Sequence, residues 1–197
     1  MIRQIHPIER ESYAILRSRA DTARLPPWTR AVTERVIHAT ADVSYLEDLD
    51  CAEETLAGAA RALQAGAPVA ADSAMTAAGI TSRHVICRVA DPGAAGLAAS
   101  ARITRSAAGI RLAHAQAGRG AVWVIGTAPT ALAGLLALDA APALVIGLPV
   151  GFVGAVEAKR ALRASGLPAV TNYSEKGGAA AAAAVLNALL YHLAAQP

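Results

Sequence analysis

The chain has 197 residues, of which 54% are hydrophobic and 17% charged, and its formal net charge is +3. This composition excludes an intrinsically disordered chain and predicts one domain over residues 1–197 with a sizeable core. The positive charges are scattered arginines rather than a basic run, and only 4% of the residues are aromatic, which argues against a nucleic-acid-binding protein.

The two cysteines, Cys51 and Cys87, lie far apart and show no CxxC or Cys/His spacing. We therefore expect two free thiols and no metal site. Gly, Pro or a charge interrupts every long hydrophobic run, and residues 1–7 lack the apolar core of a secretion signal. These features predict a cytoplasmic protein without a membrane span.

Apolar residues recur at helical spacing in the N-terminal third, and the rest of the chain alternates short apolar runs with helical segments. The expected helices are 8–20, 27–39, 52–65 (with Asp50 as a candidate cap), 92–101, 106–117, 129–138, 154–164 and 178–194. The expected strands are 68–71, 84–89, 121–125, 143–146 and 168–171. This order predicts an α/β fold, an open, mainly parallel five-stranded sheet with helices on both faces, preceded by N-terminal helices.

The stretch from Pro142 to Lys159 reads as a buried strand, a loop rich in glycine and proline, and the start of a helix. Gly147, Gly151 and Gly154 would let the backbone approach a bulky ligand closely. Open α/β sheets bind ligands beyond the carboxyl ends of their strands. We therefore predict that the loops after residues 125, 147 and 171 meet at one edge of the sheet, around one cleft.

His38 is the candidate proton donor. Glu34, His38 and Asp42 follow one another at i, i+4 spacing, which places them on one face if the helix extends that far. A neighbouring carboxylate would orient the imidazole for general acid catalysis. A structural histidine at a helix end is the alternative.

Two further polar segments lie at expected helix starts. Thr127 and Thr130 follow a strand directly, where they could cap the next helix or contact a ligand. Arg105 stands at a helix start, an unfavourable place for a cation in the helix dipole. An anionic ligand would explain this arginine, and a solvated surface position is the alternative.

Several well-known fingerprints are missing. The 172–178 loop lacks the GxxxxGK[ST] spacing of a phosphate loop, and Gly147, Gly151 and Gly154 do not form GxGxxG. No serine lies in a GxSxG context. These absences disfavour a Rossmann-like oxidoreductase and a serine hydrolase.

Eight segments, taken together and in order, resemble the precorrin-8X methylmutase family, also called precorrin isomerase or cobalt-precorrin-8 methylmutase. They are HPIE (6–9), SYAILR (12–17), ERVIHATAD (34–42), ADSAM (71–75), TRSA (104–107), GTAPTAL (126–132), GLPVGFVGA (147–155) and KGG (176–178). The resemblance is collinear and spans nearly the whole chain, so the set is far more specific than any one segment.

The resemblance implies a cofactor-independent isomerase of the cobalamin pathway that moves a methyl group between adjacent ring-C carbons of a corrinoid. It implies a homodimer that hands its product to the next enzyme. The family's essential histidine corresponds to His38, which would protonate the macrocycle. An intramolecular rearrangement needs no nucleophile, redox centre or metal, in keeping with the missing fingerprints.

The resemblance and the loop positions together give the expected corrinoid contacts. These are Ser12, Arg17, Thr104, Arg105, Thr127, Ala128, Pro129, Thr130, Gly151 and Gly177. Many relatives carry Asn at the position of Thr127, Gly-Arg at Ser174-Glu175 and Ser at Ala179, so Glu175 is left out of the contacts. A carrier that binds a corrinoid without catalysis is the alternative function. The sequence leaves open whether the substrate carries cobalt.

Overall fold

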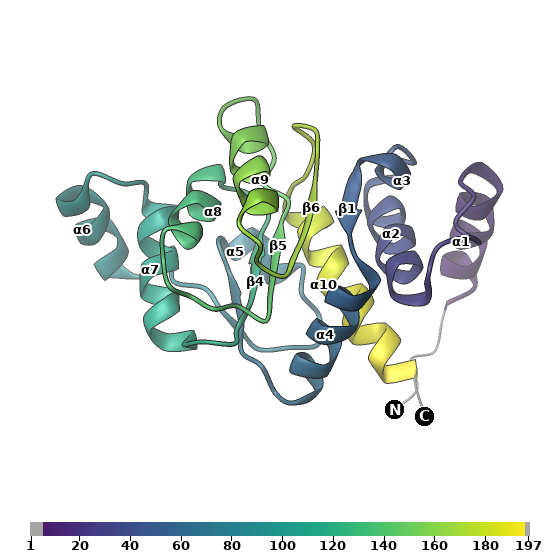
Figure 1. The fold of residues 1–197 in the computed structure, drawn as a ribbon, viewed down its shortest axis with the longest axis horizontal. Helices are drawn as coiled ribbons and strands as arrows, with labels where there is room; N and C mark the ends of the chain where they lie inside the picture. The colour runs from purple at the N-terminus through teal and green to yellow at the C-terminus, as the bar shows by residue number, and fades with distance from the viewer. Residues whose placement is uncertain (1–5, 196–197) are drawn as a thin grey trace.

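The computed structural model describes residues 6–195; residues 1–5, part of the segment considered for a secretion signal, and residues 196–197 lie outside the described residues. The helices in the described part are α1 (Pro7–Arg19), α2 (Pro27–Thr40), α3 (Tyr45–Asp48), α4 (Glu53–Gln64), α5 (Ala74–Ala78), α6 (Pro92–Ala101), α7 (Arg105–Ala117), α8 (Pro129–Leu136), α9 (Ala155–Ala164) and α10 (Ala179–Ala195). The strands are β1 (Leu49–Cys51), β2 (Val69–Ala71), β3 (Val85–Ile86), β4 (Val122–Ile125), β5 (Leu144–Gly147) and β6 (Ala169–Asn172). Figure 1 shows their arrangement.

The described strands form one open sheet in the order β1-β6-β5-β4-β2-β3. The five strands expected from the sequence are all present and pair in parallel with one another, although the expected 84–89 strand is reduced to Val85–Ile86. The prediction of five strands is wrong, because β1 adds a sixth that pairs antiparallel with β6. Asp50 therefore lies in an edge strand and does not cap α4, whose N-cap is Ala52.

Helices cover both faces of the sheet, as the alternating pattern predicted. Neighbouring residues of a strand point to opposite faces. Accordingly, Val122 and Val124 join the core shared with α2, α4 and α10, whereas Trp123 and Ile125 join the core shared with α7, α8 and α9. All four side chains are fully buried.

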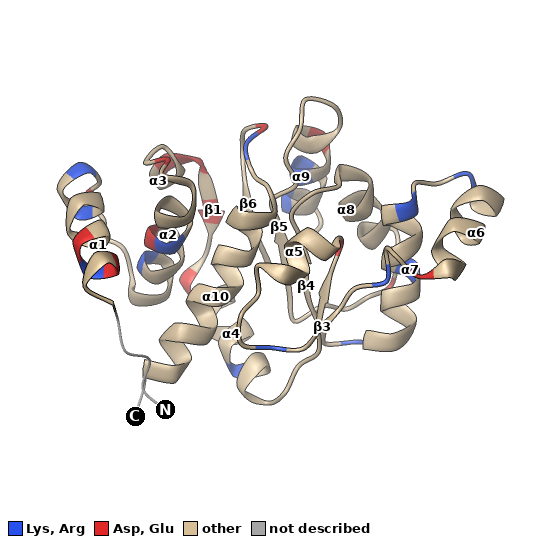
Figure 2. Cartoon of the chain, turned by 180° about the vertical axis from the view of Figure 1, so that it is seen from behind, with Lys and Arg blue, Asp and Glu red and all other residues tan. Residues whose placement is uncertain are grey.

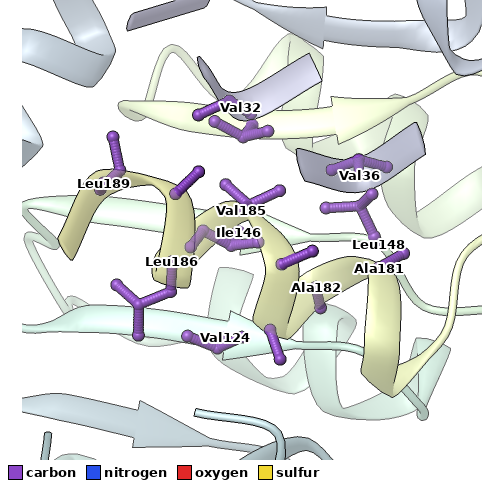
Figure 3. Packing of buried hydrophobic residues seen from close by; sticks show 14 of the residues in the cluster. Val32, Val36, Val124, Ile146, Leu148, Ala181, Ala182, Val185, Leu186 and Leu189 are labelled. Atoms are coloured by element: carbon purple, nitrogen blue, oxygen red, sulfur yellow. The ribbon is translucent and has the colours of Figure 1, made fainter. Parts of the chain in front are cut away.

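Helix α10 lies between the sheet and α2, which makes this side of the molecule two helices deep (Figure 3). Ala181 and Ala182 are fully buried there, near Ile146 of β5 and Val36 of α2 (Figure 3). Small side chains allow such close approach, and within the alanine run 179–184 only Ala180 is exposed. Helix α1 packs on the outer side of α2, at the opposite end of the molecule from α6 and α7 (Figure 1).

Candidate active site

The loops that follow β4, β5 and β6 interlock at the carboxyl edge of the sheet. The Leu148 N–H donates to the Ile125 carbonyl at 2.9 Å, and the Gly178 N–H donates to the Leu148 carbonyl at 2.9 Å. The Gly151 N–H donates to the Glu175 carbonyl at 3.1 Å. The three loops therefore meet at one edge, as the sequence predicted.

Gly177 allows this close approach. Its φ is +153°, and a Cβ at this position would lie 2.2 Å from the Leu148 carbonyl oxygen. Real side-chain carbons do not come so close to a backbone oxygen, so any other residue would push the loops apart. Gly151 and Gly177, both predicted as ligand contacts, thus hold the loops together at this edge of the sheet.

A buried carboxylate organises the loop after β4. Asp72, which directly follows β2, is 1% exposed and accepts hydrogen bonds from the backbone N–H groups of Gly126, Thr127 and Ala128 at 2.8–3.2 Å. It also accepts from the Thr127 and Thr76 hydroxyls, both at 2.8 Å. The N–H groups of Thr127 and Ala128 therefore serve a resident carboxylate, and sequence reasoning did not identify Asp72 as their partner.

Thr104 and Thr130, both predicted to contact the corrinoid, lie next to each other. Their hydroxyls are 2.8 Å apart, and Thr104 caps α7 by accepting from the Ala107 N–H at 3.2 Å. Arg105, the first residue of α7, is exposed and forms no ion pair with any residue that the structure describes. Pro129 begins α8, directly before Thr130. The two hydroxyls thus meet where α7 and α8 begin, and Arg105 follows Thr104 directly in the sequence.

His38 lies in the last turn of α2, facing α1. The Ser12 hydroxyl is 2.8 Å from its Nδ1, and the Tyr13 ring stacks on the imidazole with centroids 5.0 Å apart and planes 8° apart. Ser12 and His38 line a small pocket of about 130 Å³ between the two helices, together with Ile15 and Val43. The structure thus joins two of the predicted site residues directly.

The expected carboxylate neighbours of His38 lie elsewhere. Helix α2 ends at Thr40, and Asp42 pairs with the Lys176 ammonium at 2.9 Å. Glu34 is buried and accepts from Arg17, Arg30 and Thr22. Burial alone would raise the pKa of Glu34, but these hydrogen bonds lower it to about 2. Glu34 and His38 keep their i, i+4 spacing within α2, but the helix does not extend to Asp42, so the condition for a face shared by all three residues is not met.

The pairing of Arg17 with Glu34 is bidentate, with N–O distances of 2.9 and 2.7 Å. Arg17 was expected to contact a ligand, and its guanidinium instead joins α1 to α2 in this structure. It also borders a larger cavity of about 520 Å³ between α1, α2 and α10.

Lys159 and Asp48, neither expected from the sequence to matter, hold the loop after β6. Lys159 is fully buried, and its Nζ donates to the carbonyls of Ser174 and Lys176 at 2.7 and 2.5 Å. Asp48 accepts from the Ser174 N–H and hydroxyl at 2.9 and 2.7 Å. Ser174 is thus part of the hydrogen-bonded support of this loop.

Among residues 6–195, no cluster of three or more His, Cys, Asp or Glu side chains could hold a metal ion. No helix in that range combines the length and apolar character needed to cross a membrane. Figure 2 shows Lys and Arg spread over several helices and loops.

Fold and site together define an α/β protein in which interlocked loops form one edge of an open, mainly parallel sheet and a histidine is held between two N-terminal helices. Residues 7–192 match the family model described as precorrin-8X methylmutase. The chain belongs to this family, whose members are isomerases of cobalamin biosynthesis.

Individual relatives match over almost their full length. The cobalt-precorrin-8 methylmutase of Salmonella typhimurium is 38% identical, over 98% of this chain and 97% of its own. The precorrin-8X methylmutase of Pseudomonas aeruginosa is 41% identical, over 95% and 96%. The crystal structure of a precorrin-8X methylmutase from Thermus thermophilus is similar with a TM-score of 0.85 and 34% identity, covering 95% of each chain.

Proposed function

We propose that this enzyme moves a methyl group between adjacent ring-C carbons of precorrin-8X or cobalt-precorrin-8, giving hydrogenobyrinic acid or its cobalt form. The observation that carries the proposal is the pairing of His38 with Ser12 on facing helices, at 2.8 Å. The product is an isomer of the substrate. The macrocycle therefore loses one proton after the methyl shift, which balances the proton that it accepted before the shift. No oxidant, reductant or second substrate is consumed.

In this mechanism His38 is the general acid. The Nδ1–H of the imidazolium donates a hydrogen bond to the Ser12 oxygen and keeps its proton, while Nε2 transfers its proton to the macrocycle and leaves a neutral imidazole. Protonation draws electron density from ring C and makes the suprafacial methyl shift favourable. Ser12 can remain the hydrogen-bonding partner of Nδ1 before and after the proton transfer, because a hydroxyl can either accept from or donate to an imidazole nitrogen.

The substrate would be held by groups suited to its chemistry. A corrinoid carries several carboxylates around a wide conjugated ring. Arg105 would pair with a carboxylate, with Thr104 and Thr130 as hydrogen-bonding neighbours. The loops around Gly151 and Gly177 would form a wall against the ring face.

We infer further that the enzyme works as a homodimer. The 130 Å³ pocket at His38 falls below the volume of ordinary small-molecule sites, and a corrinoid is larger than most small ligands. Phe152 and Val153, on the loop after β5, are 96% and 89% exposed, and Met75 is 71% exposed. A second copy would cover such apolar residues and enlarge the site. Sedimentation at micromolar concentration tests this, and a monomer there would contradict it.

The deciding experiment incubates the purified enzyme with metal-free and with cobalt-bearing precorrin-8 and follows the visible spectrum. Conversion of either one supports the proposal and identifies the natural substrate class. Tight binding without conversion would instead favour the carrier. We also propose that the protein is a single domain that needs no cofactor. We propose further that it works in the cytoplasm and releases its product to the next enzyme. In the structure both cysteines are free thiols.

A further inference from the structure

Two consecutive residues of α1 contact the His38 ring from different directions. Ser12 meets the edge of the ring at Nδ1, and Tyr13 lies flat against its face, with planes only 8° apart. Successive residues of a helix point about 100° apart, which allows one to reach the edge and the next to reach the face. The hydroxyl contact by itself leaves the imidazole able to rock about one hydrogen bond, whereas the stacked ring defines its plane.

Tyr13 is itself held by charged neighbours on both helices. The charge of Arg35 acts on the Tyr13 hydroxyl and opposes the rise that burial causes in the pKa of Tyr13. The Arg35 Nη1 in turn donates to Glu9 at 2.8 Å. The Arg17 guanidinium lies 5.6 Å from the centre of the Tyr13 ring. Glu9, Tyr13 and Arg17 are spaced four residues apart along α1, so they occupy one face of the helix.

The two arginines next to Tyr13, Arg35 and Arg17, are themselves held by other residues. The Arg35 side chain is only 18% exposed and also lies over the Tyr191 ring of α10, at 5.0 Å. Arg17 is tied in turn to the buried Glu34 of α2. Movement of the Tyr13 ring would disturb contacts among α1, α2 and α10, which is a reason for the ring to keep its place.

We propose that Tyr13 is a positioning residue for His38, whose stacked ring fixes the plane in which the imidazole presents its proton to the macrocycle. This inference rests on the proposed general-acid role of His38. A shift of about 1 Å in a reacting group can cost on the order of 100-fold in rate. Loss of the stack should therefore slow the methyl shift by about 10- to 100-fold while the affinity for the corrinoid stays within about twofold.

The experiment compares Tyr13→Leu, which removes the aromatic ring, with Tyr13→Phe, which keeps the ring and removes the hydroxyl. Single-turnover rates and corrinoid dissociation constants are measured for both and for the wild type. The expected result is a slow Tyr13→Leu enzyme with near-normal affinity and a Tyr13→Phe enzyme close to the wild-type rate. Equal losses in both variants, an unchanged rate in Tyr13→Leu, or a loss of affinity instead of rate would each overturn the proposal.

Proton NMR of the histidine ring gives a readout that needs neither activity nor the leucine variant. The His38 ring protons, assigned by their loss in His38→Ala, should be shifted upfield by the Tyr13 ring in wild type and in Tyr13→Phe. Ordinary shifts in the folded wild type would overturn the proposal even if Tyr13→Leu failed to fold. A wild-type protein that shows the upfield shift but converts neither precorrin would contradict the proposed function and leave the stack intact.

Discussion

Asp72 and Thr127 are joined twice, because the Asp72 Oδ2 accepts from both the backbone N–H and the hydroxyl of Thr127 at 2.8 Å. The two residues lie just beyond the carboxyl ends of neighbouring parallel strands, β2 and β4. A carboxylate from one strand thus sets the loop of the next and satisfies N–H groups before α8 that burial would otherwise leave unpaired. The start of α8, with Thr130, is positioned from the neighbouring strand.

Asp72→Asn should lower the free energy of unfolding by about 3 kcal/mol, because hydrogen bonds to a charged group are lost and an amide NH₂ faces backbone donors. Urea unfolding measures this. Thr127→Val is the matched control, which removes only the hydroxyl bond and should cost about 1 kcal/mol. An Asp72→Asn protein as stable as the wild type would show that the carboxylate does not hold this loop.

Gly177→Ala should be markedly more harmful than Gly118→Ala. Both positions have positive φ, +153° and +70°, so both substitutions strain the backbone. Only at 177 would the new carbon also overlap a backbone oxygen, whereas at 118 nothing lies within 4 Å. We expect the 177 variant to lose at least about 2 kcal/mol more in urea unfolding. Equal losses would mean that the contact with Leu148 relaxes at little cost.

The sequence was sufficient for the parts of the fold that carry strong local patterns. The buried strands Val122–Ile125 and Leu144–Gly147 are continuous apolar runs between turn residues, and their parallel pairing follows from the helices between them. The strand Leu49–Cys51 has three half-buried residues and pairs with residues more than a hundred positions later. No local pattern distinguishes it from the approach to a helix.

The site was predictable in its parts but not in its pairings. His38 and Ser12 were both expected, yet the spacing of Glu34 favoured a carboxylate contact that the structure gives to Arg17. Helical spacing shows which residues share a face of one helix, but it cannot show which residue of another helix lies opposite. Asp72 and Lys159 escaped notice for the same reason, since their partners are loop atoms brought near only by the sheet.

Lys159 should make stability rise with pH above about 8. Burial is the main cause that lowers the pKa of Lys159 to about 8 in the folded protein, against about 10.4 when unfolded. Between these values the unfolded chain binds more protons, so the free energy of unfolding increases with pH.

The measurement is the difference in unfolding free energy between the wild type and Lys159→Met from pH 7 to 10.5. It should grow in favour of the wild type, by at most about 3 kcal/mol. Burial raises the pKa values of Tyr45 and Cys51 to about 12, which lowers stability at high pH. This effect is common to both proteins and cancels in the difference. A difference that is flat across this range would contradict the prediction.

His38→Ala should slow isomerisation by about 10²- to 10⁴-fold, the usual contribution of a positioned general acid. The affinity for the corrinoid should change little, because the proton transfer is made only in the transition state. Single-turnover spectroscopy and equilibrium binding separate the two effects. Ser12→Ala is the companion variant, which keeps the imidazole but removes its Nδ1 partner, and should lie between His38→Ala and the wild type. Near-normal isomerisation by His38→Ala would refute the catalytic role.

Arg105→Ala should chiefly weaken binding. A charge-assisted hydrogen bond to a substrate carboxylate is present in both the ground state and the transition state, and is typically worth about 1.5–3 kcal/mol. The dissociation constant should therefore rise by about 10- to 150-fold, while the rate at saturating substrate stays close to that of the wild type. Arg111→Ala, which removes an exposed arginine farther along the same helix, is the matched control for the change in net charge. Raising the salt concentration should narrow the gap between wild type and Arg105→Ala, because ions screen an exposed pair. Equal weakening by both substitutions would point to a general charge effect, and an unchanged dissociation constant in Arg105→Ala would remove this arginine from the corrinoid site.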